Sequence, residues 1–415
     1  MQPTTRTRQT TEARRQRTVT YYDYVVVGCG TMGSMALWQL TETAPEGSTI
    51  LGVEQFGRVH TKGSYAGESR LFRLIMKEGG QYVDLARRAR QLWLELNEKS
   101  GRDVFIPTGA LSIGTPEIPA MDVLDDVIAE HGLDSEKLDS EQLAERFPQF
   151  HQHEGDRGIL DPMGGAIRPE VAVAMAQNLA LDNGAELWDH TTVLAIDRAN
   201  NGDSGDSGFV ISTDKGTVRA GTVIATAGSW SAHLCPELAD YVRVKGIPLN
   251  WYMPNHIDEF TPDSLPVFIK DFIADDGRKV HVFGAPSLDG WSVKVSPLEQ
   301  PYRYTTPEAV ALNDDDVDGY VADMSEAVTG MIPSTVRTSM HHDGFTATGA
   351  PIVDVSPSTG AIVAAGMSGR GMKFAPIYGR LLAEMAVDGH SELQLPEFTL
   401  AEHVDVERAD SIVRL

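Results

Sequence analysis

The chain has 415 residues, and its 35 Lys and Arg against 59 Asp and Glu give a formal net charge of −24. A general nucleic-acid binder needs clustered cations, and an anionic membrane surface would repel this chain, so both kinds of partner are excluded. The 41% hydrophobic and 23% charged residues are typical of a globular protein. The two cysteines, Cys29 and Cys235, exclude a disulfide framework, and we expect no metal site.

Both ends of the chain are expected to lie outside the fold. Residues 1–20 are polar and basic and lack the run of roughly 7–15 apolar residues that a secretory signal needs, so we expect a disordered leader. No run of about 18 apolar residues is long enough to span a membrane, and a cytoplasmic location is predicted. The charged residues 401–415 are expected to form a peripheral tail.

The first ordered segment has the pattern of a βαβ unit. The β-branched run Tyr24–Val27 is typical of a parallel strand buried on both faces. A glycine-rich turn, Gly28–Gly33, follows it and leads into helical spacing over residues 34–43. A second strand, Thr49–Val53, ends at Glu54.

Helices and strands alternate through the rest of the chain. Further helices are expected over residues 82–100, 121–131, 140–146, 170–183, 307–330 and 376–388. Further strands are expected at residues 109–114, 184–187, 191–197, 209–213, 217–220, 222–225, 351–355 and 360–365, with several short ones in 247–295. The tract 200–208 has the composition of a surface hairpin loop. The pattern predicts an α/β fold in which one Rossmann-like nucleotide domain is interrupted by a second, strand-rich domain.

The glycine-rich turn has the GxGxxG pattern, and its residues are Gly28, Cys29, Gly30, Thr31, Met32 and Gly33. The pattern is weak alone, but here it joins a strand to a helix, and Glu54 follows Gly33 by 54 − 33 = 21 residues, against roughly 20 in dinucleotide sites. Gly28 permits the tight turn, Gly30 lets the backbone approach a pyrophosphate, and Gly33 lets the helix pack closely. Glu54 would accept hydrogen bonds from ribose hydroxyls. The motif predicts a dinucleotide and does not separate FAD from NAD; the alternative is a turn without a ligand.

A second glycine-rich turn lies near the end of the chain. Residues Ala364–Phe374 follow an expected strand and precede an expected helix. A second helix N-terminus could bind another polar part of one long cofactor, as a flavin requires. The alternative is a tight crossover loop.

With these segments on the page, the chain resembles the FAD-dependent amine oxidases of the D-amino-acid oxidase superfamily, in the monomeric sarcosine oxidase and N-methyltryptophan oxidase branch. The resemblance extends from Tyr22 to about Leu393 and is carried by residues 22–40, 60–73, 226–230, 291–294 and 364–374. It implies a FAD-binding domain formed by residues 21–110, 166–235 and 336–400. It also implies a substrate domain with an antiparallel sheet, formed by residues 111–165 and 236–335. A monomer is expected.

The resemblance assigns roles to individual residues. Lys294 matches the lysine that lies over the flavin and promotes its reaction with oxygen, and Arg73 and Lys373 match the pair that binds the substrate carboxylate. These three are the expected catalytic residues, and Phe283 and His341 are expected to contact substrate with Arg73 and Lys373. The expected cofactor-binding residues are Gly28, Gly30, Thr31, Met32, Gly33, Glu54, Gln55, Ser64, Ser69, Arg70, Val193, Gly228, Trp230, Gly369, Gly371, Met372 and Lys373.

Each of the three cations discussed most has a plain alternative. Arg70 could form a surface ion pair, Lys294 could be an exposed strand residue, and Lys373 could extend from a helix start into solvent. The chain also departs from the family pattern. Ser339 stands where a cysteine attaches FAD covalently, so FAD is predicted to bind noncovalently.

Two further departures concern the substrate. Leu298 and Phe283 replace a histidine and a tyrosine, which makes sarcosine a poor candidate and favours a larger or more apolar amine. His341 or His342 could restore a polar contact.

The expected reaction is oxidation of a carboxylate-bearing secondary or primary amine to an imine, with O2 reduced to hydrogen peroxide. N-methyl, cyclic and glycated amino acids all remain open as substrates. Three rivals also remain: a dehydrogenase on the same fold with another electron acceptor, an NAD-dependent dehydrogenase, and a flavin-binding protein without turnover.

Overall fold

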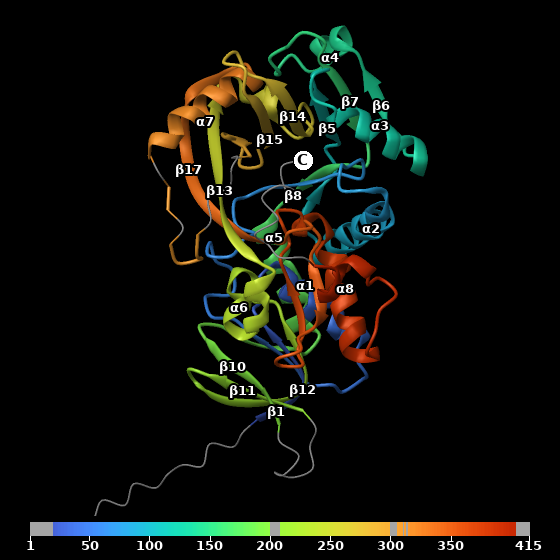
Figure 1. Cartoon of the computed structure of the whole chain (residues 1–415), viewed down its shortest axis with the longest axis vertical. Coiled ribbons are helices and arrows are strands. Elements are labelled where there is room, and N and C mark those ends of the chain that lie inside the picture. The colour runs from blue at the N-terminus through green and yellow to red at the C-terminus, as the bar shows by residue number, and fades with distance from the viewer. Residues whose placement is uncertain (1–19, 200–207, 299–304, 310, 313, 404–415) are drawn as a thin grey trace, which may run out of the picture.

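The computed structural model of the chain describes residues 20–199, 208–298, 305–309, 311–312 and 314–403. Figure 1 shows one sheet, with β1 and β10–β12, at one end of the molecule and a second sheet, with β13–β15 and β17, at the other. Helices α1 and α8 lie between them. The predicted mixed α/β fold is therefore confirmed. The leader 1–20 up to residue 19, residues 200–207 of the loop and residues 404–415 of the tail lie outside the described residues.

The first sheet has parallel strands at its centre, as a nucleotide-binding domain requires. Strand β1 (Thr20–Val27) pairs in parallel with β2 (Ile50–Val53) on one side and with β12 (Gly216–Ala225) on the other. Beyond them, β9 (Glu186–Trp188) pairs with β2 and β19 (Ile362–Ala365) pairs with β12, again in parallel. Strands from both ends of the described chain thus meet in one sheet, as the sequence pattern predicts.

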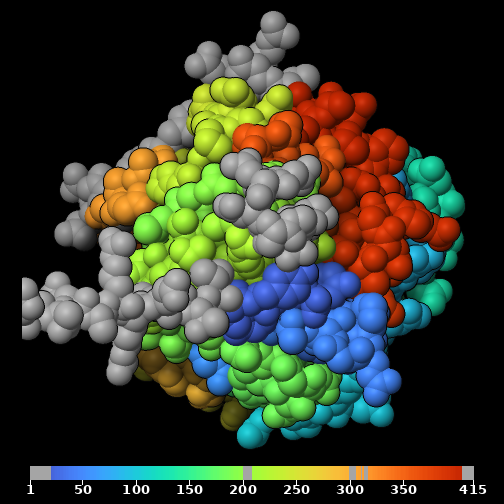
Figure 2. Space-filling model, turned by 90° about the horizontal axis from the view of Figure 1, so that it is seen from below, coloured from blue at the N-terminus to red at the C-terminus, as the bar shows by residue number. Residues whose placement is uncertain are grey.

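Antiparallel strands complete this sheet. Strands β10 (Val193–Arg198) and β11 (Phe209–Thr213) extend it beyond β12, and β18 (Ile352–Val355) pairs with β19. The strands expected at 217–220 and 222–225 form the single strand β12, because the pairing with β1 continues on both sides of Gly221. Figure 2 shows the interleaving at the surface, where the blue N-terminal segment lies against green segments and close to the red C-terminal one.

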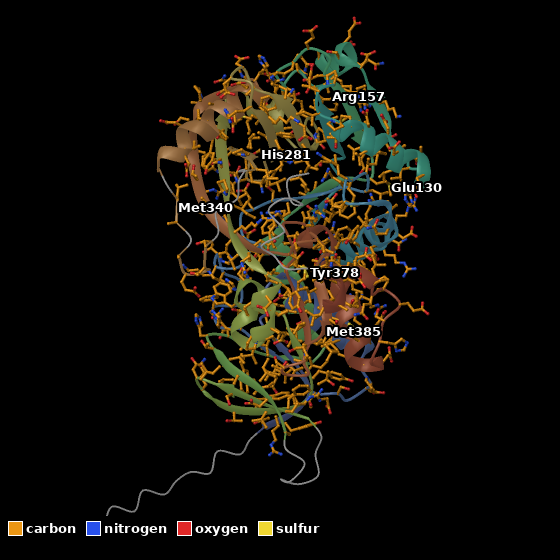
Figure 3. All side chains as sticks on the ribbon, viewed as in Figure 1. Glu130, Arg157, His281, Met340, Tyr378 and Met385 are labelled. Atoms are coloured by element: carbon orange, nitrogen blue, oxygen red, sulfur yellow. The ribbon has the colours of Figure 1, made fainter. Side chains whose placement is uncertain are left out.

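Helices cover the first sheet. Helix α1 (Thr31–Thr43) packs against α5 (Pro169–Asp182) and α8 (Gly371–Asp388), and α2 (Val83–Ser100) packs against both of these. Figure 3 labels Tyr378 and Met385 of α8, which are 2% and 6% exposed within the core beneath these helices. No helix in the described part of the chain combines the length and the apolar character that crossing a bilayer requires.

Helix α8 begins five residues before the start that the sequence predicted at Pro376. The proline lies inside the helix, in its second turn, where it removes one intrahelical hydrogen bond without ending the helix. Lys373 therefore belongs to the first turn of α8 rather than to the preceding loop. A cation is disfavoured there, because the helix N-terminus is itself positive.

The second sheet is mostly antiparallel. In spatial order it contains β17 (Met331–Phe345), β13 (Arg243–Pro254), β16 (Val293–Pro297), β15 (Lys279–Ala285), β14 (Val267–Ile273), β5 (Ala110–Gly114), β7 (Arg157–Asp161) and β6 (Glu136–Leu138). Its accompanying helices are α3 (Ala120–His131), α4 (Ser140–Arg146) and α7 (Asp314–Ala327). Strand β17 continues to Phe345, so this sheet includes residues placed after 335 in the expected FAD-binding domain.

Three short strands make a small third sheet. Strand β8 (Gly165–Ile167) pairs antiparallel with β3 (Arg70–Phe72) and with β4 (Phe105–Ile106). The short helix α6 (Ser231–Leu234) follows the Gly228–Trp230 turn. The strand β3 matters for the site, because it ends just before Arg73.

Candidate active site

A cavity of about 1550 Å³ extends from the glycine-rich turn after β1 to the second sheet. It is larger than the roughly 300–1,000 Å³ typical of small-ligand pockets, so a dinucleotide and a substrate both have room. All but three of the predicted site residues line it. The exceptions are Gly33, Ser69 and Lys294. The structure thus brings together residues that are more than 300 positions apart in the sequence, such as Gly28 and Lys373.

The turn after β1 tolerates only glycine at two positions. Gly28 has φ +86°, and a Cβ on it would lie 2.7 Å from the carbonyl oxygen of Thr226. A Cβ on Gly33 would lie 1.9 Å from the carbonyl oxygen of Gly28. Gly33 therefore acts by letting α1 approach the strand ends, although it does not line the cavity. At Gly30, by contrast, a Cβ would meet only the Tyr65 ring at 3.8 Å, so this side of the turn is open.

Glu54 lies at the end of β2, beside the glycine-rich turn. Its carboxylate accepts hydrogen bonds from the backbone N–H groups of Cys29 and Phe56, at 2.8 and 2.9 Å, and lies 3.4 Å from His60 Nε2. Burial alone would raise the pKa of Glu54, but the contact with His60 and these backbone donors outweigh burial and lower it. The group is therefore an ionised acceptor at the predicted ribose position.

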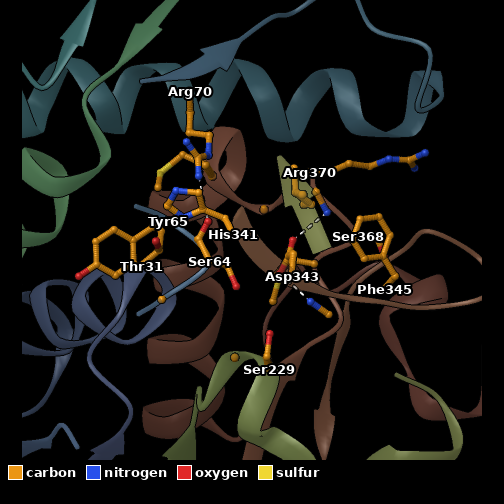
Figure 4. A pocket seen from close by; sticks show the side chains of 18 of the residues that line it. Thr31, Ser64, Tyr65, Arg70, Ser229, His341, Asp343, Phe345, Ser368 and Arg370 are labelled. Carbon is orange, nitrogen blue, oxygen red and sulfur yellow. Dashed lines mark hydrogen bonds between the residues drawn. The ribbon is translucent and has the colours of Figure 1, made fainter. Parts of the chain in front are cut away.

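The second glycine-rich turn also borders the cavity. Asp343, at the end of β17, accepts hydrogen bonds from the backbone N–H groups of Gly344 and Gly369, both at 2.8 Å (Figure 4). Burial raises the pKa of Asp343. These bonds attach the turn before α8 to the second sheet. Asp343 was not predicted, and the only signal for it is an acid next to a histidine pair.

Two helices begin at the cavity without a side-chain cap. Helix α1 has Gly30 at its N-cap and α8 has Arg370, and neither N-cap side chain accepts a hydrogen bond from its helix. Their first backbone N–H groups are therefore available to polar groups of a ligand. Two such helix ends facing one long cavity, with an ionised acid between strand ends, fit FAD.

The segment between Ser64 and Arg70 is held together by the arginine. The Arg70 guanidinium donates to the carbonyl oxygens of Ser64, Ala66 and Ser69, at 3.0, 2.7 and 2.7 Å. The alternative of a surface ion pair is not what the structure shows. Burial lowers the pKa of Arg70. Ser69 Oγ is buried without a hydrogen-bond partner in the described structure, so it remains a donor that a ligand can use.

Lys294 lies in a different environment from the one predicted. It is 2% exposed, which excludes an exposed strand lysine, but it does not line the cavity. Its Nζ donates to the carbonyl oxygen of Ser69 and lies 3.4 Å from that of Gly67. Burial and the nearby charge of Arg70 hold the pKa of Lys294 well below its usual value. The lysine therefore supports the Arg70 segment from behind the cavity wall.

Arg73 and Lys373 come together as predicted, but they share an acid. Lys373 Nζ donates to Glu78 Oε1, and Arg73 Nη2 lies 3.9 Å from the same oxygen. Burial would raise the pKa of Glu78, yet the charges of Lys373 and Arg73 overcome this and hold it far below its usual value. Burial lowers the pKa of Lys373 to about 8 despite the Glu78 carboxylate. The sequence analysis missed Glu78, whose only signal is an acid directly after an apolar stretch.

The two neighbouring histidines have different surroundings. His341 lines the cavity, and its Nε2 lies 2.7 Å from Ser339 Oγ. Burial and the charges of Arg70 and Lys294 lower the pKa of His341 to about 3, so the imidazole is neutral. His342 does not line the cavity; its Nδ1 lies 2.8 Å from Ser229 Oγ. Figure 4 shows His341 in the same part of the site as Arg70 and Ser64.

The substrate end of the cavity also has an apolar wall. Its aliphatic and aromatic members are Ile118, Ile247, Leu249, Ile269, Phe283 and Leu298. Ser339 is not among the lining residues, and neither Cys29 nor Cys235 is. Both thiols are buried, and burial raises the pKa of each.

Comparison with known proteins agrees with this geometry. The chain is 28% identical over 375 residues to monomeric sarcosine oxidase from Streptomyces avermitilis, a match that covers 89% of this chain and 94% of the relative. It is 25% identical over 389 residues to N-methyl-L-tryptophan oxidase from Salmonella typhi, covering 92% and 98%. The solved structure of NikD, described as an unusual amino acid oxidase essential for nikkomycin biosynthesis, aligns with a TM-score of 0.78 at 20% identity, covering 92% of this chain and 98% of that one.

A family model settles the assignment. The DAO model, described as FAD dependent oxidoreductase, matches residues 23–385, which include both glycine-rich turns and every predicted site residue. The resemblance seen in the sequence is confirmed, and the cofactor is FAD. The chain therefore belongs to the DAO family of FAD-dependent oxidoreductases.

Proposed function

We propose that this protein oxidises a secondary or primary amine that carries a carboxylate, and that O2 is the final electron acceptor. The C–N single bond becomes an imine with loss of two electrons and two protons, and O2 takes them up as hydrogen peroxide. The observation that carries this proposal is the position of Arg73 and Lys373, which lie in the same cavity as the dinucleotide-binding turn. A guanidinium beside an ammonium is well suited to a carboxylate.

The chain's own residues bind and orient the substrate in this proposal. FAD, when bound, accepts the two electrons that leave the amine. Arg73 holds the carboxylate, and the apolar wall that includes Ile269 and Phe283 excludes water from the reacting carbon. The same wall favours a neutral amine over an ammonium, because an unpaired charge is costly in an apolar environment. The imine product hydrolyses in water.

Noncovalent binding of FAD is part of the proposal. Ser339 cannot form a thioether, and neither cysteine lines the cavity. We expect acid precipitation of the holoprotein to release the flavin into the supernatant. A yellow pellet would contradict this.

The proposed reaction is tested on the purified holoprotein with a panel of amines. The panel contains N-methyl, cyclic and glycated amino acids, with sarcosine as the member expected to react poorly. Peroxide release in air and bleaching of the flavin without oxygen are both recorded. If no member of the panel bleaches the flavin, the proposed substrate class is wrong.

A dehydrogenase with another acceptor is the second candidate, and one observation favours it. Lys294, the expected oxygen-activating cation, contacts backbone carbonyl groups and does not line the cavity. The two readouts separate the candidates: an oxidase bleaches without oxygen and releases peroxide in air, whereas a dehydrogenase bleaches but reacts slowly with air until a quinone or dye is added. The chain is also proposed to be monomeric, which gel filtration of the holoprotein measures.

A further inference from the structure

The substrate end of the cavity already contains a carboxylate that belongs to the chain. Glu78 has a side chain that is 8% exposed, and its Oε1 accepts a hydrogen bond from Lys373 Nζ. The same oxygen lies 3.9 Å from Arg73 Nη2. A carboxylate of the substrate would use these same two cations. Glu78 thus stands between the two members of the predicted carboxylate-binding pair.

The two cations are engaged by Glu78 to different degrees. Lys373 is bonded to it directly, whereas Arg73 is in ionic contact only, at 3.9 Å. In the described structure, Arg73 Nη1 is buried without a hydrogen-bond partner. A buried donor that lacks an acceptor is unfavourable, so this nitrogen is where an oxygen atom of a ligand would bind.

Other charged residues at this end of the cavity also occur in pairs. Lys77 Nζ lies 2.9 Å from Asp271 Oδ2, and Arg278 Nη2 lies 3.0 Å from Asp323 Oδ1. Arg370, at the N-cap of α8, contributes a more distant positive charge. Among these groups, Arg73 has the donor left over for a ligand.

We propose that Glu78 is a specificity-determining residue: it neutralises Lys373, leaves Arg73 as the direct anchor, and thereby restricts the site to amines with a single carboxylate. This inference rests on the proposed amine oxidation and adds the charge of its substrate. A second carboxylate on the substrate would lie near Glu78 and be repelled by it, because like charges in a poorly hydrated site cannot both be accommodated cheaply. Glu78 also offsets the unfavourable position of Lys373 in the first turn of α8.

A purely structural role for Glu78 makes a different prediction, and carboxylate binding separates the two. The holoprotein is titrated with acetate and with malonate at pH 6.5, and binding is read from the change in the flavin absorbance spectrum. Glu78→Gln frees Lys373 to join Arg73, so the dissociation constant of acetate should fall about tenfold, and that of malonate should fall further. Unchanged or weaker binding in E78Q overturns the proposal.

A double variant tests the pairing itself. In Lys373→Met, Glu78 is left with Arg73 alone, so acetate binding should weaken about tenfold. In the E78Q/K373M double variant, Arg73 is again the direct anchor, and the dissociation constant should return to within about threefold of the original. If K373M weakens binding equally with and without Glu78, the two residues are independent and the proposal fails. FAD content and thermal unfolding of each variant verify that it is folded and loaded.

Asp323→Asn is the matched control, because it removes one negative charge from another ion pair that lines the same cavity. Its acetate binding should change less than about twofold. An equal gain in D323N would mean that E78Q acts through the general field, which overturns the specific role of Glu78. Since these titrations need no turnover, they can succeed even if no amine is oxidised, in which case the proposed function alone fails.

Discussion

The two ends of the cavity differ in how directly the sequence encodes them. At the nucleotide end, the determining contacts are local and made by backbone: a Cβ on Gly33 would meet the carbonyl oxygen of Gly28, only five residues away. At the substrate end, the determining contact joins Glu78 to Lys373 across 295 positions and is made by side chains alone. Backbone constraints give a spacing that can be recognised in the sequence. Side-chain partners depend on how distant segments fold together, and they have no such spacing.

The largest effect is expected at the nucleotide end, from Gly33→Ala. The added methyl group would lie 1.9 Å from a backbone oxygen, which no side-chain movement can relieve. We expect G33A to be purified without FAD or not to fold, as judged by the flavin absorbance and by thermal unfolding. Gly319→Ala is the control, because a Cβ at that helical position meets nothing within 4 Å. If G33A retains a full complement of FAD, the close approach of α1 is not needed.

A smaller but still large effect is expected at the substrate end, from Arg73→Leu. Removing one partner of a buried charge pair costs roughly 2–5 kcal/mol in comparable interfaces, so kcat/KM for a carboxylate-bearing amine should fall about 1,000-fold. Anaerobic reduction of the flavin by the best amine of the panel measures this without involving the acceptor. An Arg73→Leu variant that reduces its flavin at the original rate would remove Arg73 from the substrate site.

Lys294→Met tests whether the predicted role survives the unexpected position of the lysine. If the cation promotes the reaction with oxygen, reoxidation of the reduced flavin should slow by about 100-fold, while reduction by substrate changes little. Stopped-flow mixing of the reduced protein with oxygenated buffer measures the first rate. If both rates fall together, Lys294 acts through the Arg70 segment that it supports, because that segment borders the whole cavity. Unchanged reoxidation would end its assignment as the oxygen-activating residue.

Much of the fold and part of the site could be predicted from the sequence, for reasons visible in particular residues. The βαβ unit, both glycine-rich turns and the pairing of strands from the two ends of the chain follow from local patterns, and the structure agrees. The start of α8 was misplaced because Pro376 resembles a first-turn proline, whereas the helix tolerates it one turn later. Glu78 and Asp343 were missed because an acid earns notice only when its partners are known. The surroundings of Lys294 could not be predicted, since strand alternation says nothing of the loop that covers it.

The smallest expected effect is a pH dependence of carboxylate binding, and it again belongs to the substrate end. Burial lowers the pKa of Lys373 to about 8, from a usual value near 10.5. As the pH rises through 8, Lys373 loses its proton, and Glu78 is left with Arg73 as its remaining partner. The site then has one positive charge fewer, so acetate should bind more weakly, by up to about tenfold between pH 7 and pH 9. Titration of the holoprotein with acetate across this range, followed by the flavin spectrum, measures the change. In Lys373→Met the dependence should disappear, because the titrating group is gone. A pH profile that is the same in K373M would assign the titration to another group and would leave the nucleotide end, with its ionised Glu54, as the place to look for it.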